Sequence, residues 1–209
     1  MKNKKQKGEQ FWDRTAKSYD RSESKDFKQN KLIVDAIKKY TNTSDSVLDF
    51  ACGTGTYAIE MASIAKNVVA IDLSQKMLEI AEEKTQKLSI KNIDFLQASI
   101  FDENLKNETF DIVYAFYILH LLEDPQEVLM QIYSLLKPGD LFITVCPCMG
   151  ESKVLGGLMS FISRLGFLPS VYAYKAKELE LYITKLNFKI IESQKLEGSF
   201  NQQFLVCKK

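Results

Sequence analysis

The hydrophobic positions of this chain alternate between two kinds of segment. Short, largely apolar runs have the length of buried strands, and they fall near 45–50, 67–72, 92–97, 111–116 and 139–146. Helices are expected between these runs, near 55–65, 74–88 and 125–137. Because parallel strands need crossover connections, the alternation predicts an α/β protein with a doubly wound, Rossmann-like sheet and helices on both faces.

The two ends of the chain follow a different pattern. Two helices are expected before the first strand, at 8–20 and 27–41. Beyond residue 146 the pattern predicts two further helices and two closing strands, at 151–165, 176–186, 188–193 and 203–207. Apolar residues crowd between 151 and 174, which indicates either ordinary packing or an apolar pocket or lid.

A turn of small residues follows the first predicted strand. Ala51, Gly53 and Gly55 carry little or no side chain, so a ligand can approach the backbone, and the glycines can adopt positive φ. A strand, such a turn and a helix start are typical of a nucleotide-binding crevice. Asp72 ends the next apolar run, where an acidic group accepts hydrogen bonds from ribose hydroxyls.

Two classes of cofactor fit this turn. Residues 53–58 formally match the dinucleotide pattern G-x-G-x-x-G/A, which would suit NAD and a dehydrogenase. Asp49, however, ends the strand as a carboxylate, which would repel a pyrophosphate and attract an ammonium or a sulfonium. S-adenosylmethionine carries both cations and is therefore the favoured cofactor.

Five segments, in order, resemble the class I S-adenosylmethionine-dependent methyltransferases, in particular the small-molecule group called methyltransferase domain 11. They are FWDRTAKSYD at 11–20, LDFACGTG at 48–55, VVAIDLSQKML at 68–78, FDIVYAFYILHLLEDP at 110–125 and LLKPGDLFI at 135–143. The resemblance implies a seven-stranded sheet of order 3-2-1-4-5-7-6 with strand 7 antiparallel. It also implies a single domain over 1–209, with a lid at 1–42 and an apolar helical cap at 147–175.

The same resemblance implies the residues that hold S-adenosylmethionine. The turn would line its methionine portion, Asp72 its ribose, and Tyr19 would cover the methionine end. The full expected set is Tyr19, Asp49, Ala51, Gly53, Gly55, Asp72, Leu73, Met77, Ser99, Ile100, Ala115, Phe116 and Tyr117.

The chain departs from the group's pattern at four positions. Ala51 replaces the usual first glycine of the turn, and Ser99 replaces an aspartate that receives the adenine amino group. Leu121 replaces the second histidine of L-H-H, and Asp140 replaces the second glycine after Pro138. These differences bear on the substrate and on the catalytic group more than on the cofactor.

His120 is the only histidine, and it follows the fourth predicted strand. It is the candidate general base, because a carbon or hydroxyl acceptor needs one. The alternative interpretation is a rim histidine that shapes the pocket or bonds to backbone. Cys146 and Cys148 leave open a cysteine nucleophile of the kind used by cytosine-C5 RNA methyltransferases.

Composition narrows the possible partners. The net charge is +1 at pH 7, which gives no electrostatic case for nucleic-acid binding. Four cysteines, at 52, 146, 148 and 207, show neither metal nor disulfide spacing. We therefore expect no metal and a cytoplasmic location. Residues 154–174 are interrupted by Arg164 and Pro169, so no transmembrane segment is expected, although the apolar cap could touch a membrane.

The sequence favours a methyltransferase that acts on a small, neutral or apolar acceptor. Two alternatives stay open beside the dehydrogenase. One is an RNA base methyltransferase that uses the basic start of the chain and a cysteine. The other is a non-catalytic protein that binds S-adenosylmethionine.

Overall fold

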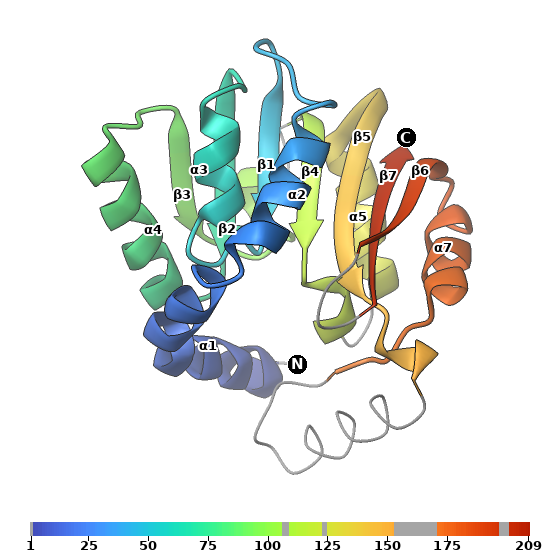
Figure 1. Cartoon of the computed structure of the whole chain (residues 1–209), viewed down its shortest axis with the longest axis horizontal. Coiled ribbons are helices and arrows are strands. Elements are labelled where there is room, and N and C mark those ends of the chain that lie inside the picture. Colours follow the sequence, from blue (N-terminus) through green and yellow to red (C-terminus); the bar gives the residue numbers. More distant parts are fainter. Residues whose placement is uncertain (1, 106–108, 123–124, 153–170, 197–200) are drawn as a thin grey trace. The chain divides into compact units, whose positions relative to one another are not determined.

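The computed structural model describes residues 2–105, 109–122, 125–152, 171–196 and 201–209 (Figure 1). It divides into two compact units, Met1–Glu103 and Asn104–Lys209. Within the described ranges, no helix combines the length and apolarity needed to cross a membrane. The expected helix at 151–165 lies almost wholly outside the described residues, as does most of the expected cap.

The strands form one seven-stranded sheet in the order β3-β2-β1-β4-β5-β7-β6. β7 pairs antiparallel with both β5 and β6, so the predicted topology is confirmed. The strands are β1 (Ser46–Phe50), β2 (Asn67–Asp72), β3 (Ile93–Gln97), β4 (Phe110–Phe116), β5 (Leu136–Pro147), β6 (Lys189–Leu196) and β7 (Gln202–Lys208).

The first unit contains the parallel strands β1, β2 and β3. Its helices are α1 (Lys2–Glu23), α2 (Phe27–Ile37), α3 (Thr56–Ala62) and α4 (Gln75–Leu88). In Figure 1, α2 and α3 lie in front of these strands. Val47, Leu48, Val68 and Ile71 are fully buried, as a parallel strand covered on both faces requires.

Helix α1 is longer than the expected 8–20, and it is anchored on the start of α4. Ser74 is the N-cap of α4, and its hydroxyl accepts from Met77 N at 3.2 Å. The same hydroxyl donates to Asp13 Oδ1 at 2.6 Å, and Lys76 N donates to that oxygen at 3.2 Å. The carboxylate of Asp13 thus lies at a helix N-terminus, where negative charge is favourable.

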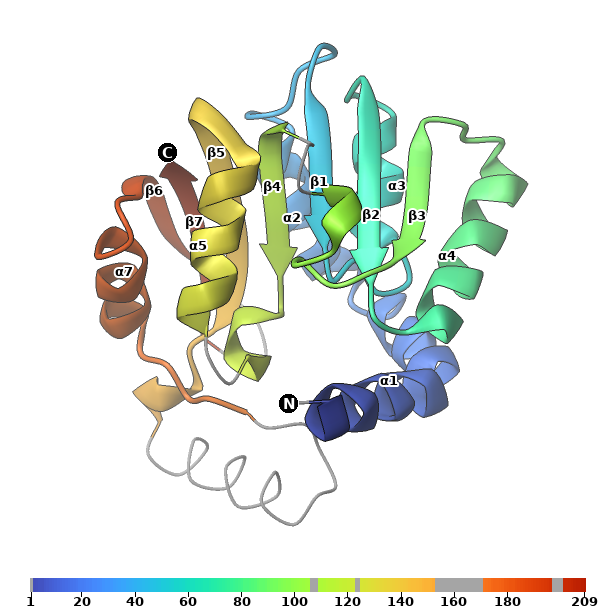
Figure 2. The ribbon, with the colours of Figure 1, turned by 180° about the vertical axis from the view of Figure 1, so that it is seen from behind.

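The second unit contains β4 to β7 with helices α5 (Pro125–Leu135) and α7 (Ala176–Thr184). Figure 2 shows α5 in front of β4 and β5. Pro125 begins α5, where the missing N–H costs nothing. β5 starts three residues earlier than expected, because the chain bends at Gly139 (φ 90°) without leaving the sheet. Short 3₁₀ turns follow β4 at Leu119–Leu121 and β5 at Met149–Glu151.

Candidate cofactor site and acceptor-side residues

The turn after β1 holds three left-handed residues. Ala51 has φ 60°, Gly53 φ 55° and Gly55 φ 78°. The two glycines adopt positive φ as predicted, and Ala51 does so as well, which strains its backbone by about 1 kcal/mol. Cys52 N donates to Ile71 O at 3.0 Å, so the turn is tied to the end of β2.

The two glycines meet different neighbours. A Cβ on Gly55 would lie 2.8 Å from the Cβ of Ala81, so close packing of α4 against the turn requires glycine there. A Cβ on Gly53 would lie 3.5 Å from Cε1 of Tyr19. The ring of Tyr19 therefore lies in van der Waals range of the turn, and its role as a lid stays a prediction.

Asp72 is bonded to this turn. Its Oδ2 accepts from Gly53 N at 3.0 Å and its Oδ1 accepts from Ser74 N at 2.8 Å. Burial raises the pKa of the carboxyl, and these backbone donors oppose the rise. A carboxylate has about four acceptor positions, so two backbone bonds leave capacity for ribose hydroxyls.

Asp49 is the most deeply buried acid of the site. It is 2% exposed, and its Oδ2 has no hydrogen-bond partner among the described residues. Burial raises its pKa to about 7, and the charges of Glu23 and Asp72 add to the rise. A buried carboxylate with one free oxygen is incomplete without a cation or a proton.

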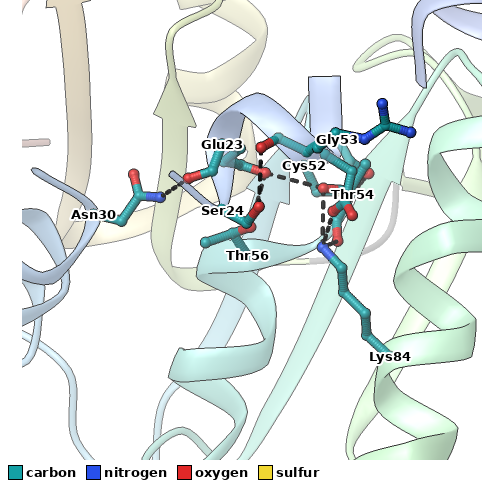
Figure 3. A network of polar contacts seen from close by, with 10 residues as sticks. Glu23, Ser24, Asn30, Cys52, Gly53, Thr54, Thr56 and Lys84 are labelled. Atoms are coloured by element: carbon teal, nitrogen blue, oxygen red, sulfur yellow. Dashed lines mark hydrogen bonds and ion pairs between the residues drawn. The ribbon is translucent and has the colours of Figure 1, made fainter. Parts of the chain in front are cut away.

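Glu23, at the C-terminal end of α1, is a site residue that the sequence reasoning missed. Its Oε2 accepts from the hydroxyls of Thr54 at 3.0 Å and Thr56 at 2.8 Å (Figure 3). Burial raises the pKa of Glu23 and the two hydroxyls oppose the rise. The sequence signal for this contact was a hydroxyl residue on either side of Gly55, at Thr54 and Thr56. A local pattern cannot identify the acid that accepts hydrogen bonds from these hydroxyls.

Lys84 of α4 completes this network from the other side. Its Nζ donates to Thr54 O and to Thr54 Oγ1, each at 3.1 Å, and it forms an ion pair with Asp20. The backbone of Glu23 is held as well, because Asn30 Nδ2 donates to Glu23 O at 3.0 Å. The end of α1 is therefore fastened to the turn directly through Glu23 and indirectly through Lys84, as Figure 3 shows from close by.

The residues expected beside the adenine gather at the end of β2. Ala98 N donates to Asp72 O at 3.0 Å, which brings the segment with Ser99 and Ile100 next to Leu73. Ser99 is half-buried, whereas Ile100 and Met77 are almost fully buried, at 1% and 2% exposed. In this arrangement Met77 and Ile100 can offer an apolar wall, and Ser99 can offer a hydroxyl.

The expected residues of the second unit follow β4. Ala115 and Phe116 are buried, and Ala115 O accepts from the Thr144 hydroxyl at 2.6 Å. Tyr117 has φ 55°, a strained value for an aromatic residue. Its N donates to Val145 O at 2.8 Å and its hydroxyl to Gln202 Oε1 at 2.9 Å, so neighbouring strands hold the strained residue in place.

His120 lies in the 3₁₀ turn after β4. Its Nδ1 is buried without a hydrogen-bond partner among the described residues, and burial lowers its pKa to about 4. The imidazole is therefore neutral at pH 7. Its backbone carbonyl accepts from Tyr172 N at 2.7 Å, which ties the turn to the segment before α7.

The cysteines of the second unit are poor nucleophiles. Cys146 and Cys148 are buried, and burial raises the pKa of Cys148 to about 11 and that of Cys146 further. Since the thiolate is the reactive form, both side chains are inert at neutral pH. This finding removes the structural support for a cysteine-based methyl transfer to RNA.

Comparison with known proteins identifies the family. A family model described as a methyltransferase domain matches residues 41–199. The chain is 30% identical over 178 residues to the demethylmenaquinone methyltransferase of Lactococcus lactis subsp. lactis, a match that covers 75% of this chain and 70% of that enzyme. Two further curated relatives are uncharacterized methyltransferases of Schizosaccharomyces pombe. The chain matches only 46% and 60% of the length of these two proteins. The chain belongs to the methyltransferase domain family.

Solved structures agree with this assignment. An S-adenosylmethionine-dependent methyltransferase of Methanosarcina mazei matches with a TM-score of 0.68 at 18% identity, covering 83% of this chain and 96% of that one. A second, from Clostridium acetobutylicum, has a TM-score of 0.65 at 19% identity, with coverages of 87% and 90%. At these identities the likeness shows the fold alone: the chain shares the fold of S-adenosylmethionine-dependent methyltransferases.

The residues of the first unit fit that cofactor. The free Oδ2 of Asp49 calls for a cation, and the cofactor carries an ammonium and a sulfonium. Gly53 leaves the backbone open beneath Tyr19, and Asp72 keeps acceptor capacity at the end of β2. Ser99 directly follows Ala98, whose N–H donates to Asp72 O.

Proposed function

We propose that this enzyme transfers a methyl group to a small, neutral or apolar acceptor, and that a hydroxyl or carbon atom receives it. The observation that carries this proposal is the character of His120: a half-buried, neutral imidazole whose buried Nδ1 has no partner among the described residues. An imidazole in this state can accept a hydrogen bond from an acceptor's hydroxyl, and its lowered pKa makes it a weak base that takes the proton only as the methyl group is transferred. The burial that keeps it neutral also disfavours a charged group beside it.

In the proposed site, residues of the first unit hold the cofactor. Asp49 and the turn would face its amino-acid portion, Asp72 its ribose, and Leu73, Met77, Ser99 and Ile100 its adenine. Ala115, Phe116 and Tyr117 are proposed to contribute from the second unit. The cofactor supplies an electrophilic methyl group on sulfur, so the protein's own task is to align the acceptor and exclude water.

The relative from Lactococcus lactis is named for demethylmenaquinone, a quinone. A quinol of that kind combines an apolar ring with an acidic hydroxyl and a reactive ring carbon, which suits a neutral base. We therefore propose quinols and similar phenols as the first acceptors to test. The predicted lid at 1–42 and apolar cap at 147–175 belong to the same proposal, with the cap enclosing an apolar acceptor.

The first experiment follows labelled S-adenosylmethionine in the presence of purified protein and fractionated cell extract. Label in the organic-soluble pool supports the proposal, and label in RNA would overturn it. Cofactor binding without any transfer would favour a binding protein. A second assay offers reduced demethylmenaquinone directly, with menaquinone, which already carries the methyl group, as the matched control. Transfer to the first and none to the second is the expected result.

A further inference from the structure

Two carboxyl groups bond to the start of α3, and the sequence reasoning anticipated only one of them: the half-buried Glu23 accepts from the Thr56 hydroxyl, and the buried Asp49 accepts from the backbone of Ala58. Asp49 comes from β1 and Glu23 from the end of α1. After burial, the charge of Glu23 contributes most to the raised pKa of Asp49, ahead of the charge of Asp72. The other ionisable groups around the pair are Asp20 of α1, Cys52 of the turn, Asp72 of β2 and Lys84 of α4.

The hydrogen bonds of the two groups differ. Glu23 Oε2 accepts from two hydroxyls, so charge on Glu23 is partly stabilised where it lies. Asp49 receives a backbone hydrogen bond from Ala58, and its Oδ2 has no partner. Two like charges in a poorly solvated site cannot both be held without compensation. Lys84 lowers the pKa of Glu23, but its own bonds go to Thr54 and Asp20.

We propose that Glu23 and Asp49 titrate as a coupled pair, which holds one proton in the cofactor-free enzyme and releases it when the cofactor's ammonium group binds. The inference rests on the proposed placement of the cofactor at this turn. It makes Glu23 a positioning residue: Glu23 fixes Thr54 and Thr56 and tunes Asp49. It also couples cofactor affinity to pH in the range where Asp49 titrates.

The sign of the coupling follows from the charge. The cation prefers the fully ionised pair, so binding strengthens as the pH rises through the pKa of Asp49, which is about 7. For one linked proton, affinity should increase about tenfold between roughly pH 6 and pH 8 and level off above. Proton release should be near half a proton per site at about pH 7, because the group is then about half protonated.

The test is calorimetric titration in buffers of different ionisation enthalpy, which counts released protons without any methyl transfer. S-adenosylhomocysteine is the probe, because it carries the ammonium group and is chemically inert as a donor. 5′-Methylthioadenosine is the matched control, because it retains the adenosine and the thioether but lacks the amino-acid portion. We expect proton release and pH-dependent affinity with the first ligand and neither with the second.

Two variants should move the linkage in opposite directions. Glu23→Gln removes the neighbouring charge, so the midpoint of the pH dependence should fall. The increase in affinity between roughly pH 6 and pH 8 should then shrink from about tenfold to about threefold or less. Thr56→Val removes one donor to Glu23, so the pair should keep its proton to higher pH. Glu83→Gln, an exposed glutamate of α4, should leave both quantities unchanged.

Equal proton release with both ligands would overturn the proposal, and so would an unchanged pH dependence in Glu23→Gln. If Glu23→Gln does not fold, Thr56→Val and the wild-type ligand comparison still decide the question. pH-independent binding of S-adenosylhomocysteine would refute the pair while leaving the cofactor site intact. Absence of binding at every pH would refute the site itself.

Discussion

The two units of this enzyme present opposite electrostatic environments. In the first unit, Glu23, Asp49 and Asp72 surround one turn, and burial raises the pKa of all three. In the second unit, the groups after β4 and β5 are a neutral histidine and protonated thiols. The first environment suits a cationic cofactor and the second a neutral acceptor.

Because of this contrast in charge, substitutions in the two units should have different effects on cofactor binding, stability and the reaction. The acidic turn stores unfavourable charge that a cation relieves, so neutralising Asp49, whose Oδ2 has no partner among the described residues, should weaken binding and raise stability. The neutral residues of the second unit carry no such stored charge, so substitutions there should affect the reaction more than the cofactor.

His120→Ala should produce the largest change. If the imidazole is the base, kcat should fall on the order of 10²-fold or more with an acceptor that loses a proton, while cofactor affinity stays within about twofold. Because its pKa is about 4, the wild-type rate should show no inflection from His120 between about pH 5 and pH 8. Steady-state kinetics across this range, with calorimetry for binding, checks both statements. An unchanged kcat would reduce His120 to a residue that shapes the site.

Asp49→Asn should weaken S-adenosylmethionine binding by about 2–3 kcal/mol, since a charge-assisted partner of the cation is lost. The same change should stabilise the cofactor-free protein. The folded-state pKa of about 7 lies above the ordinary 3.8, so the folded state binds more protons in between and loses stability as the pH rises through that window. The full cost, on the order of a few kcal/mol, is present above about pH 7.

Thermal unfolding of Asp49→Asn should therefore show a higher Tm than wild type at about pH 8 and a smaller difference at about pH 5. Asp94→Asn is the matched control, because Asp94 is an exposed aspartate on β3 in the same unit. A Tm gain that is equal at both pH values would show that charge is not its cause.

Asp72→Ala should weaken cofactor affinity by roughly 1–3 kcal/mol, the range for hydrogen-bonding groups left without partners. It should also lower stability, because Gly53 N and Ser74 N lose their acceptor. Calorimetry and thermal unfolding measure the two effects separately, with Asp94→Ala as the control. A lower Tm with an unchanged dissociation constant would make Asp72 a structural residue of the turn only.

Much of the fold could be predicted because its signals are local. β2 matches its expected range of 67–72, Ser74 caps α4, and Pro125 begins α5. The contact of Glu23 with Thr54 could not be predicted, because it joins residues 31 positions apart and depends on how α1 packs. The same holds for the free oxygen of Asp49 and the raised pKa of Cys148, since both follow from burial rather than from sequence pattern.

The smallest expected effect concerns Ala51, where the chain departs from the family's glycine. Its φ of 60° costs an alanine about 1–2 kcal/mol, whereas glycine loses about 0.5–1 kcal/mol of additional chain entropy on folding. Ala51→Gly should therefore stabilise the protein by about 0.5–1 kcal/mol and leave cofactor affinity within about twofold. Ser89→Gly is the matched control, because Ser89 has φ 57° at the end of α4, away from the turn. Denaturant unfolding should give similar gains for both variants if backbone strain is the cause. A gain at Ser89 with a loss at Ala51 would show instead that the alanine methyl group packs usefully in the acidic turn.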